Sequence, residues 1–152
     1  MGRRREQHQK PSPHVANIGR LLKILGMSQL DFARASGINL AYMNQLLSGR
    51  KTNPTLDALA KIASGFGLSV AVLVDQRLDE ADLRRELSQA ALRLALKRGV
   101  SEHPKFVRYI DTDQAPLTVA DWERLGHVLV IAEGPSRRRR ATAARNRVAR
   151  PD

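Results

Sequence analysis

Apolar residues recur at intervals of three and four along most of the chain, which is the spacing of one face of an α-helix. The first such run extends from Val15 to Leu25 and ends at Gly26. The next runs follow Ser28, Asn39 and Thr55, residue types that favour the N-cap position of a helix. Strand-like alternation is nearly absent. The pattern therefore predicts an all-α protein.

The first part of the chain is divided into short helices by glycines. A helix over Gln29–Ala35 is expected to end at Ser36-Gly37, and the helix after Asn39 at Ser48-Gly49. A polar loop follows, then a helix from Thr55 to Gly67 and a short apolar turn over Val70–Val74. These elements predict a five-helix domain over residues 14–76.

The second part begins with a long helix expected over Asp79–Arg98, with the stripe Leu83, Leu87, Ala90, Ala91 and Leu94 on one face. A short helix is expected at Phe106–Ile110. Thr118, followed by Asp121, predicts the start of a last helix that carries Trp122. The run Val128–Ala132 is compatible with a short strand instead.

Charge is concentrated at the two ends of the chain. The 152 residues contain 26 Lys and Arg against 15 Asp and Glu, a formal net charge of +11. Residues 135–152 hold seven Arg against one Asp and almost no large apolar side chain. Such a segment cannot bury enough apolar surface to fold alone, so we expect disordered basic termini at 1–13 and 135–152. The net positive charge favours a polyanionic partner.

Composition excludes several classes of chemistry. Cysteine is absent, which rules out disulfides, thiol catalysis and Cys-ligated zinc. The histidines lack metal-ligand spacing, and no set of nucleophile, base and orienting residue stands out. No apolar run is long enough to span a membrane, and no signal-peptide core follows the basic opening segment. We therefore expect a cytoplasmic protein that is not an enzyme and uses no metal or cofactor.

Residues 28–63 contain a series of small, apolar and glycine positions in a characteristic order. These positions are Ser28-Gln29, Ala33, Gly37-Ile38, Met43, Leu46, Gly49, Pro54, Leu56, Leu59 and Ile62-Ala63. In type and spacing they resemble the lambda-repressor/Cro-like (XRE) helix-turn-helix family, and the resemblance extends over about residues 14–75. In this family the second motif helix enters the major groove of DNA.

The resemblance implies which side chains face the DNA bases. Gln45 is suited to pair with adenine through N6 and N7, and Leu40 and Ala41 are suited to thymine methyl groups. Tyr42 is large for its place, and either a phosphate contact or packing against the preceding turn fits it. The implied base contacts are Asn39, Leu40, Ala41, Tyr42, Asn44 and Gln45.

The resemblance also implies which residues grip the DNA backbone. Gln29 lies at the start of the first motif helix, where a phosphate is expected. The other positions follow the recognition helix. Phosphate contacts position the protein, whereas base contacts specify the site. The implied phosphate contacts are Gln29, Ser48, Arg50, Lys51, Thr52 and Asn53.

Residues 77–134 are nearly neutral, with nine Lys and Arg against ten Asp and Glu, which makes them a poor surface for nucleic acid. Helix-turn-helix regulators bind as dimers, so we interpret this region as the dimerisation part. Its expected dimer contacts are Leu83, Leu87, Leu94 and Trp122. The alternatives are packing within a monomer and, for Trp122, a place in the core.

These observations predict a sequence-specific, nucleoid-associated DNA-binding regulator, a repressor that binds a palindromic operator as a homodimer. Two other hypotheses stay open. One is a nucleoid-architectural protein whose Arg-rich ends dominate binding to double-stranded DNA. The other is an antitoxin-like module that binds a protein partner through residues 77–134.

Overall fold

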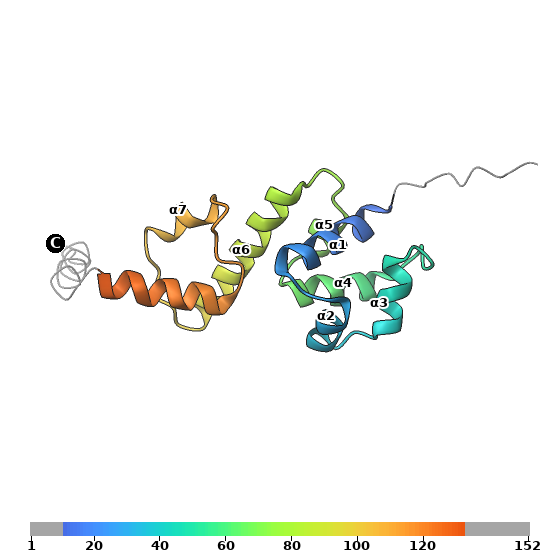
Figure 1. The fold of residues 1–152 in the computed structure, drawn as a ribbon, viewed down its shortest axis with the longest axis horizontal. Coiled ribbons are helices and arrows are strands. Elements are labelled where there is room, and N and C mark those ends of the chain that lie inside the picture. The colour runs from blue at the N-terminus through green and yellow to red at the C-terminus, as the bar shows by residue number, and fades with distance from the viewer. Residues whose placement is uncertain (1–10, 133–152) are drawn as a thin grey trace, which may run out of the picture. The chain divides into compact units, whose positions relative to one another are not determined.

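The computed structural model describes residues 11–132, and this part of the chain is all-helical (Figure 1). The predicted Arg-rich tail, 135–152, and nearly all of the predicted basic arm, 1–13, lie outside the described residues. None of the helices between residues 11 and 132 is both long and apolar enough to cross a bilayer. In chain order the helices are α1 (Pro13–Leu25), α2 (Gln29–Ser36), α3 (Leu40–Leu47), α4 (Leu56–Phe66), α5 (Val70–Val74), α6 (Glu80–Lys97), α7 (Phe106–Ile110) and a last helix over residues 119–132.

The chain divides into two compact units between Ala90 and Ala91, inside α6. The sequence had placed this border at residues 76 and 77. The first part of α6 belongs with the preceding helices because Leu83 and Leu87 are buried and Ala90 lies close to the end of α4. A Cβ added to Gly67 would meet the Ala90 methyl at 3.6 Å.

The first unit is a bundle of α1 to α5 with the start of α6. Helix α1 packs against α3 and α5, while α4 packs against α2 and α5. The Phe32 and Phe66 rings stack with their centroids 4.2 Å apart, which joins α2 to α4. The predicted N-caps are confirmed at Ser28, Asn39 and Thr55, whose side-chain oxygens each accept a backbone N–H three residues later.

A buried asparagine joins the first and fifth helices. Asn17 is 1% exposed, and its Nδ2 donates to the carbonyl oxygens of Val72, Leu73 and Asp75 at 3.2, 3.0 and 2.8 Å. These carbonyls lie at the end of α5, where a helix leaves its last acceptors without intrahelical partners. The side chain of Asn17 therefore closes the bundle across more than fifty residues of sequence.

Charged side chains fix the short segment between α5 and α6. Arg77 donates to the Asp75 carboxylate at 2.9 and 3.0 Å, and these hydrogen bonds lower the pKa of Asp75 to about 2. Arg20 donates to the Leu78 carbonyl at 3.1 Å. Asp79 and Asp82 each accept the other's backbone N–H, which forms a reciprocal cap at the start of α6.

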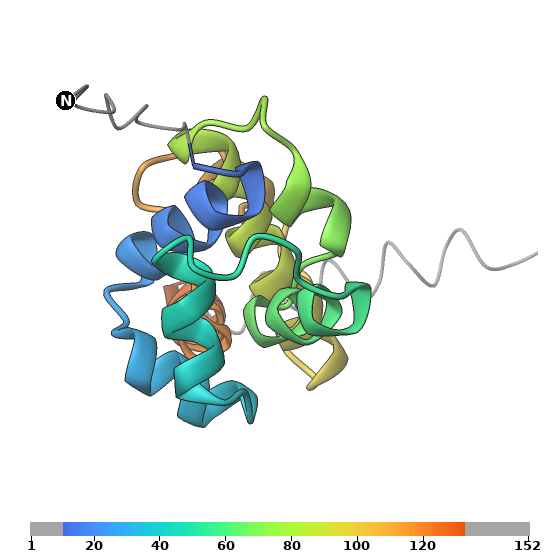
Figure 2. The same ribbon diagram turned by 90° about the vertical axis from the view of Figure 1, so that its right-hand side faces the viewer.

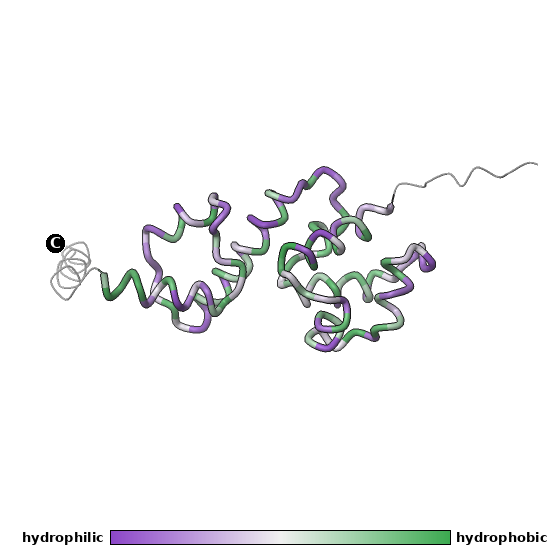
Figure 3. Tube along the Cα trace, in the orientation of Figure 1, coloured by the Kyte–Doolittle hydropathy of each residue, from purple (hydrophilic) through white to green (hydrophobic). Residues whose placement is uncertain are grey.

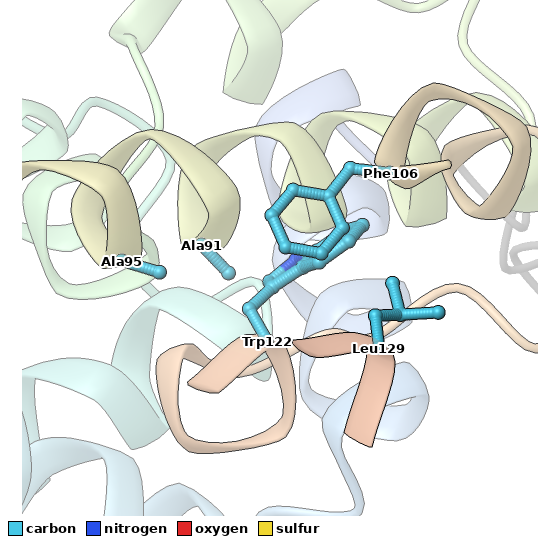
Figure 4. Packing of buried hydrophobic residues seen from close by; sticks show 5 residues of the cluster. All are labelled: Ala91, Ala95, Phe106, Trp122 and Leu129. Carbon is cyan, nitrogen blue, oxygen red and sulfur yellow. The ribbon is translucent and has the colours of Figure 1, made fainter. Parts of the chain in front are cut away.

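The second unit has its own aromatic core. Trp122 is fully buried and meets Phe106 edge-on at 5.1 Å, against Ala91 and Ala95 of α6 and Leu129 (Figure 4). Residues 119–132 are helical throughout, so the alternative of a strand over 128–132 is wrong.

Three of the four predicted dimer contacts lie inside the single chain, as the alternative of packing within a monomer expects. Leu83, Leu87 and Trp122 are buried within the single chain, so their side chains are not surface groups. Leu94 alone of the four is exposed, at 43%. An apolar stripe on a helix signals burial, and here the chain itself supplies the covering residues.

Gly65 is expected to be irreplaceable in α4 because α2 lies against it. A Cβ at Gly65 would meet the Ser36 Oγ at 2.6 Å and the Phe32 ring at 2.8 Å. We expect Gly65→Ala to lower the free energy of unfolding by about 1–3 kcal/mol, as overpacking does, despite the better helix propensity of alanine. Urea denaturation measures this difference.

Gly19→Ala is the matched control. Gly19 lies inside α1, and a Cβ there has nothing within 4 Å. This substitution should raise the free energy of unfolding by roughly 0.5–1 kcal/mol through helix propensity alone. Equal effects of the two substitutions would contradict the close approach of α2 and α4.

Candidate nucleic-acid interface

Helix α3 is anchored by its apolar face and leaves its polar face to solvent. Met43 and Leu46 are fully buried, whereas Ala41, Asn44 and Gln45 are exposed. Helix α2 packs alongside α3 (Figure 2). The turn between them uses Gly37 at φ 67°, a left-handed conformation that glycine adopts at no steric cost. Packing against α2 and the burial of Met43 and Leu46 therefore fix the orientation of α3, and its polar face points to solvent.

The residues predicted to face bases lie together on α3 and its first turn. Asn39, Ala41, Asn44 and Gln45 are exposed, and Leu40 is half-buried. Asn39 already uses its Oδ1 to accept the Tyr42 N–H at 3.2 Å. Its Nδ2 group remains as the donor for an external acceptor.

Tyr42 faces the preceding turn. Its hydroxyl oxygen is buried and has no hydrogen-bond partner among the described residues. The ring lines a hollow of about 390 Å³ together with Gly37 and Ile38 of the α2–α3 turn and Ala58 of α4. Of the two alternatives for Tyr42, this placement favours packing against the turn over a phosphate contact.

The loop after α3 is a hydrophilic stretch that carries the predicted phosphate contacts other than Gln29 (Figure 3). Its shape is set by the Gln45 carbonyl, which accepts the Lys51 N–H at 3.0 Å and the Ser48 hydroxyl at 3.2 Å. Lys51 is half-buried, with its Nζ 4.7 Å from the centre of the Tyr42 ring. Arg50, Thr52 and Asn53 are exposed.

Gln29 begins α2 beside the capping residue Ser28, and it is half-buried. The Ser28 hydroxyl accepts the Asp31 N–H at 3.0 Å. The remaining free N–H groups of this first turn carry the partial positive charge of a helix N-terminus, which attracts phosphate. The geometry is therefore compatible with the phosphate contact expected at Gln29.

Comparison with known proteins identifies this unit. A family model described as helix-turn-helix matches residues 18–73, which include α2, α3 and the part of α1 from Ile18 onward. Residues 18–73 are a helix-turn-helix domain of the lambda-repressor/Cro-like (XRE) type. Searches of curated proteins and of solved structures gave no match.

The family is one of DNA-binding transcription regulators, so the helix-turn-helix domain supports that function for this chain. The match confirms the resemblance drawn from the sequence. The individual DNA contacts stay predictions. Among residues 11–132 no group of His, Asp and Glu is arranged to hold a metal ion.

One feature of the helix-turn-helix domain was missed by sequence reasoning. It is the contact between Lys51 and the Tyr42 ring, which joins residues nine positions apart across a loop. The cap at Asn39 is signalled by Asn before an apolar run, whereas no local pattern signals the ring contact.

The cap at Asn39 is testable apart from DNA binding. We expect Asn39→Ala to lower the free energy of unfolding by about 1 kcal/mol, because the Tyr42 N–H loses its acceptor. Asn39→Ser should keep nearly all the stability, since serine caps about as well. Thermal unfolding of the two variants compares them, and equal losses would mean that the cap is not what stabilises α3.

Proposed function

We propose that this protein is a transcriptional repressor that binds a palindromic operator as a homodimer, in the cytoplasm and on the nucleoid. The observation that carries the proposal is the exposed polar face of α3, with Asn44 and Gln45, next to a loop rich in phosphate-binding side chains. In this arrangement α3 enters the major groove and the loop contacts the adjoining backbone. The role needs no metal, cofactor or catalytic group.

Charge in the first part supports this orientation. Arg50 and Lys51 follow α3 directly, and no acidic residue lies between Asp31 and Asp57. The loop after α3 therefore offers a duplex phosphate chain positive charge and polar donors, while Asp57 lines the hollow that it shares with Asn39 and Tyr42. Such contacts give affinity that falls with salt, while the α3 side chains supply sequence preference.

The dimer surface is proposed on the last helix and not on the buried stripe of α6. Val128 is 61% exposed and Ile131 is 79% exposed. Residues three apart lie on the same face of a helix, so the two form one apolar patch. We expect a second copy of this chain to cover the patch, because a palindromic operator offers two equivalent half-sites.

Sequence preference is tested by selecting bound sites from a random duplex pool at about 0.15 M salt. We expect an inverted repeat with half-sites about 10 base pairs apart. Gln45→Ala should then lose about 1–3 kcal/mol of discrimination at one adenine position. Gln76→Ala, which removes an exposed glutamine beyond α5, is the control and should keep the preference.

Tight binding without any enriched sequence would contradict the repressor proposal. It would favour the nucleoid-architectural alternative, in which the Arg-rich ends supply affinity regardless of sequence. Absence of binding would favour the partner-binding alternative.

The dimer is tested by sedimentation of the full chain. The double variant Val128→Gln and Ile131→Gln should shift the protein from dimer to monomer without unfolding it, because both side chains are exposed in the single chain. Val107→Gln removes a similarly exposed valine from α7 and should leave the dimer intact. A dimer that survives the double variant would place the interface elsewhere.

A further inference from the structure

Lys51 is tied to the recognition helix at two points. Its backbone N–H donates to the Gln45 carbonyl at 3.0 Å, and its ammonium lies 4.7 Å from the centre of the Tyr42 ring. Both partners belong to α3, while Lys51 itself belongs to the loop that follows. The loop therefore folds back toward α3 and places the Lys51 ammonium over the ring of Tyr42.

The position of Tyr42 is fixed by residues of the α2–α3 turn and of α4. Its side chain lines the hollow between the α2–α3 turn and the start of α4, and its hydroxyl oxygen is out of contact with solvent. A hydroxyl in this position has no exposed polar atom to offer a base or a phosphate. What Tyr42 presents outward is the electron-rich ring, which attracts a cation.

We propose that Tyr42 is a positioning residue that holds the Lys51 ammonium beside α3, where Lys51 binds a DNA phosphate next to the bases read by Gln45. The proposal rests on the proposed function and refines it, since it moves Tyr42 out of the base-reading set. The ring limits the conformations of a long, flexible side chain before DNA arrives. Binding then loses less side-chain entropy than it would with a free lysine.

The contact is tested first in the free, full-length protein by NMR. A cation above an aromatic ring lies in the ring's shielding region, so the Lys51 ε-methylene protons should resonate upfield of those of Lys23, an exposed lysine of α1. Tyr42→Leu should abolish this shift and Tyr42→Phe should keep it. A Lys51 signal indistinguishable from that of Lys23 in the unaltered protein would overturn the proposal.

The role in binding is tested by affinity for the selected duplex over a range of salt concentrations. Lys51→Met should reduce the salt slope by about one, as expected for one lost phosphate contact. Tyr42→Leu should weaken binding about two- to fivefold, the range of an exposed cation–π contact. Tyr42→Phe should restore most of this loss because the ring is retained.

The decisive comparison is the double variant. In the Lys51→Met background, Tyr42→Leu should cause no further weakening, because the ring then has no cation to hold. In the Lys23→Met background, which removes one positive charge elsewhere, Tyr42→Leu should keep its full effect. Equal weakening by Tyr42→Leu in all backgrounds, or by Tyr42→Phe and Tyr42→Leu alike, would overturn the proposal.

Failure of the proposed function is distinguishable from failure of this inference. If the unaltered protein binds no duplex while the upfield shift of Lys51 is present, the contact exists but DNA binding is refuted, and the role of Lys51 falls with it. If the duplex binds and the variants act independently, the proposed function stands and the positioning role is wrong.

Discussion

The carboxamide of Asn17 is the interaction on which the arrangement of the first unit depends. It satisfies carbonyl oxygens at the end of α5 that no residue of α5 can reach. A buried acceptor left without a partner costs about 1–3 kcal/mol, a large share of the stability of a small domain. Because α1 also packs against α3, the residue that fixes α1 to α5 fixes the support of the recognition helix as well.

The position of α3 is then set by its packing against α2 and by its N-cap. Helix α2 lies close enough to α4 that only glycine fits at position 65, and it presents its other side to α3. Asn39 then sets where α3 begins, and the Gln45 carbonyl sets the path of the loop after it. The exposed polar face is thus positioned mainly by contacts on the buried face of α3, together with a cap and a loop hydrogen bond made by residues of the exposed face.

Local signals made much of this predictable from the sequence. The caps at Ser28, Asn39 and Thr55 and the turn at Gly37 each depend on residues within a few positions, so the pattern alone identifies them. Asn17 and Gly65 depend on partners that are distant in sequence. A single asparagine in an apolar stripe looks like an ordinary helix residue, and a glycine near a helix end looks like a terminator, until the neighbouring helix is known.

The same reason explains why the sequence leaves open whether the long apolar stripe of α6 meets a second copy of the chain or packs within a monomer. Periodicity shows that a face is covered, but it does not show by what. Leu83 and Leu87 are buried in the first unit, whereas Ala91 and Ala95 belong to the core around Trp122. One helix thus supplies residues to two cores in turn. The proposed dimer surface therefore uses side chains that neither core buries, such as Val128 and Ile131, and of the four contacts expected from the sequence only Leu94 is exposed in the same way.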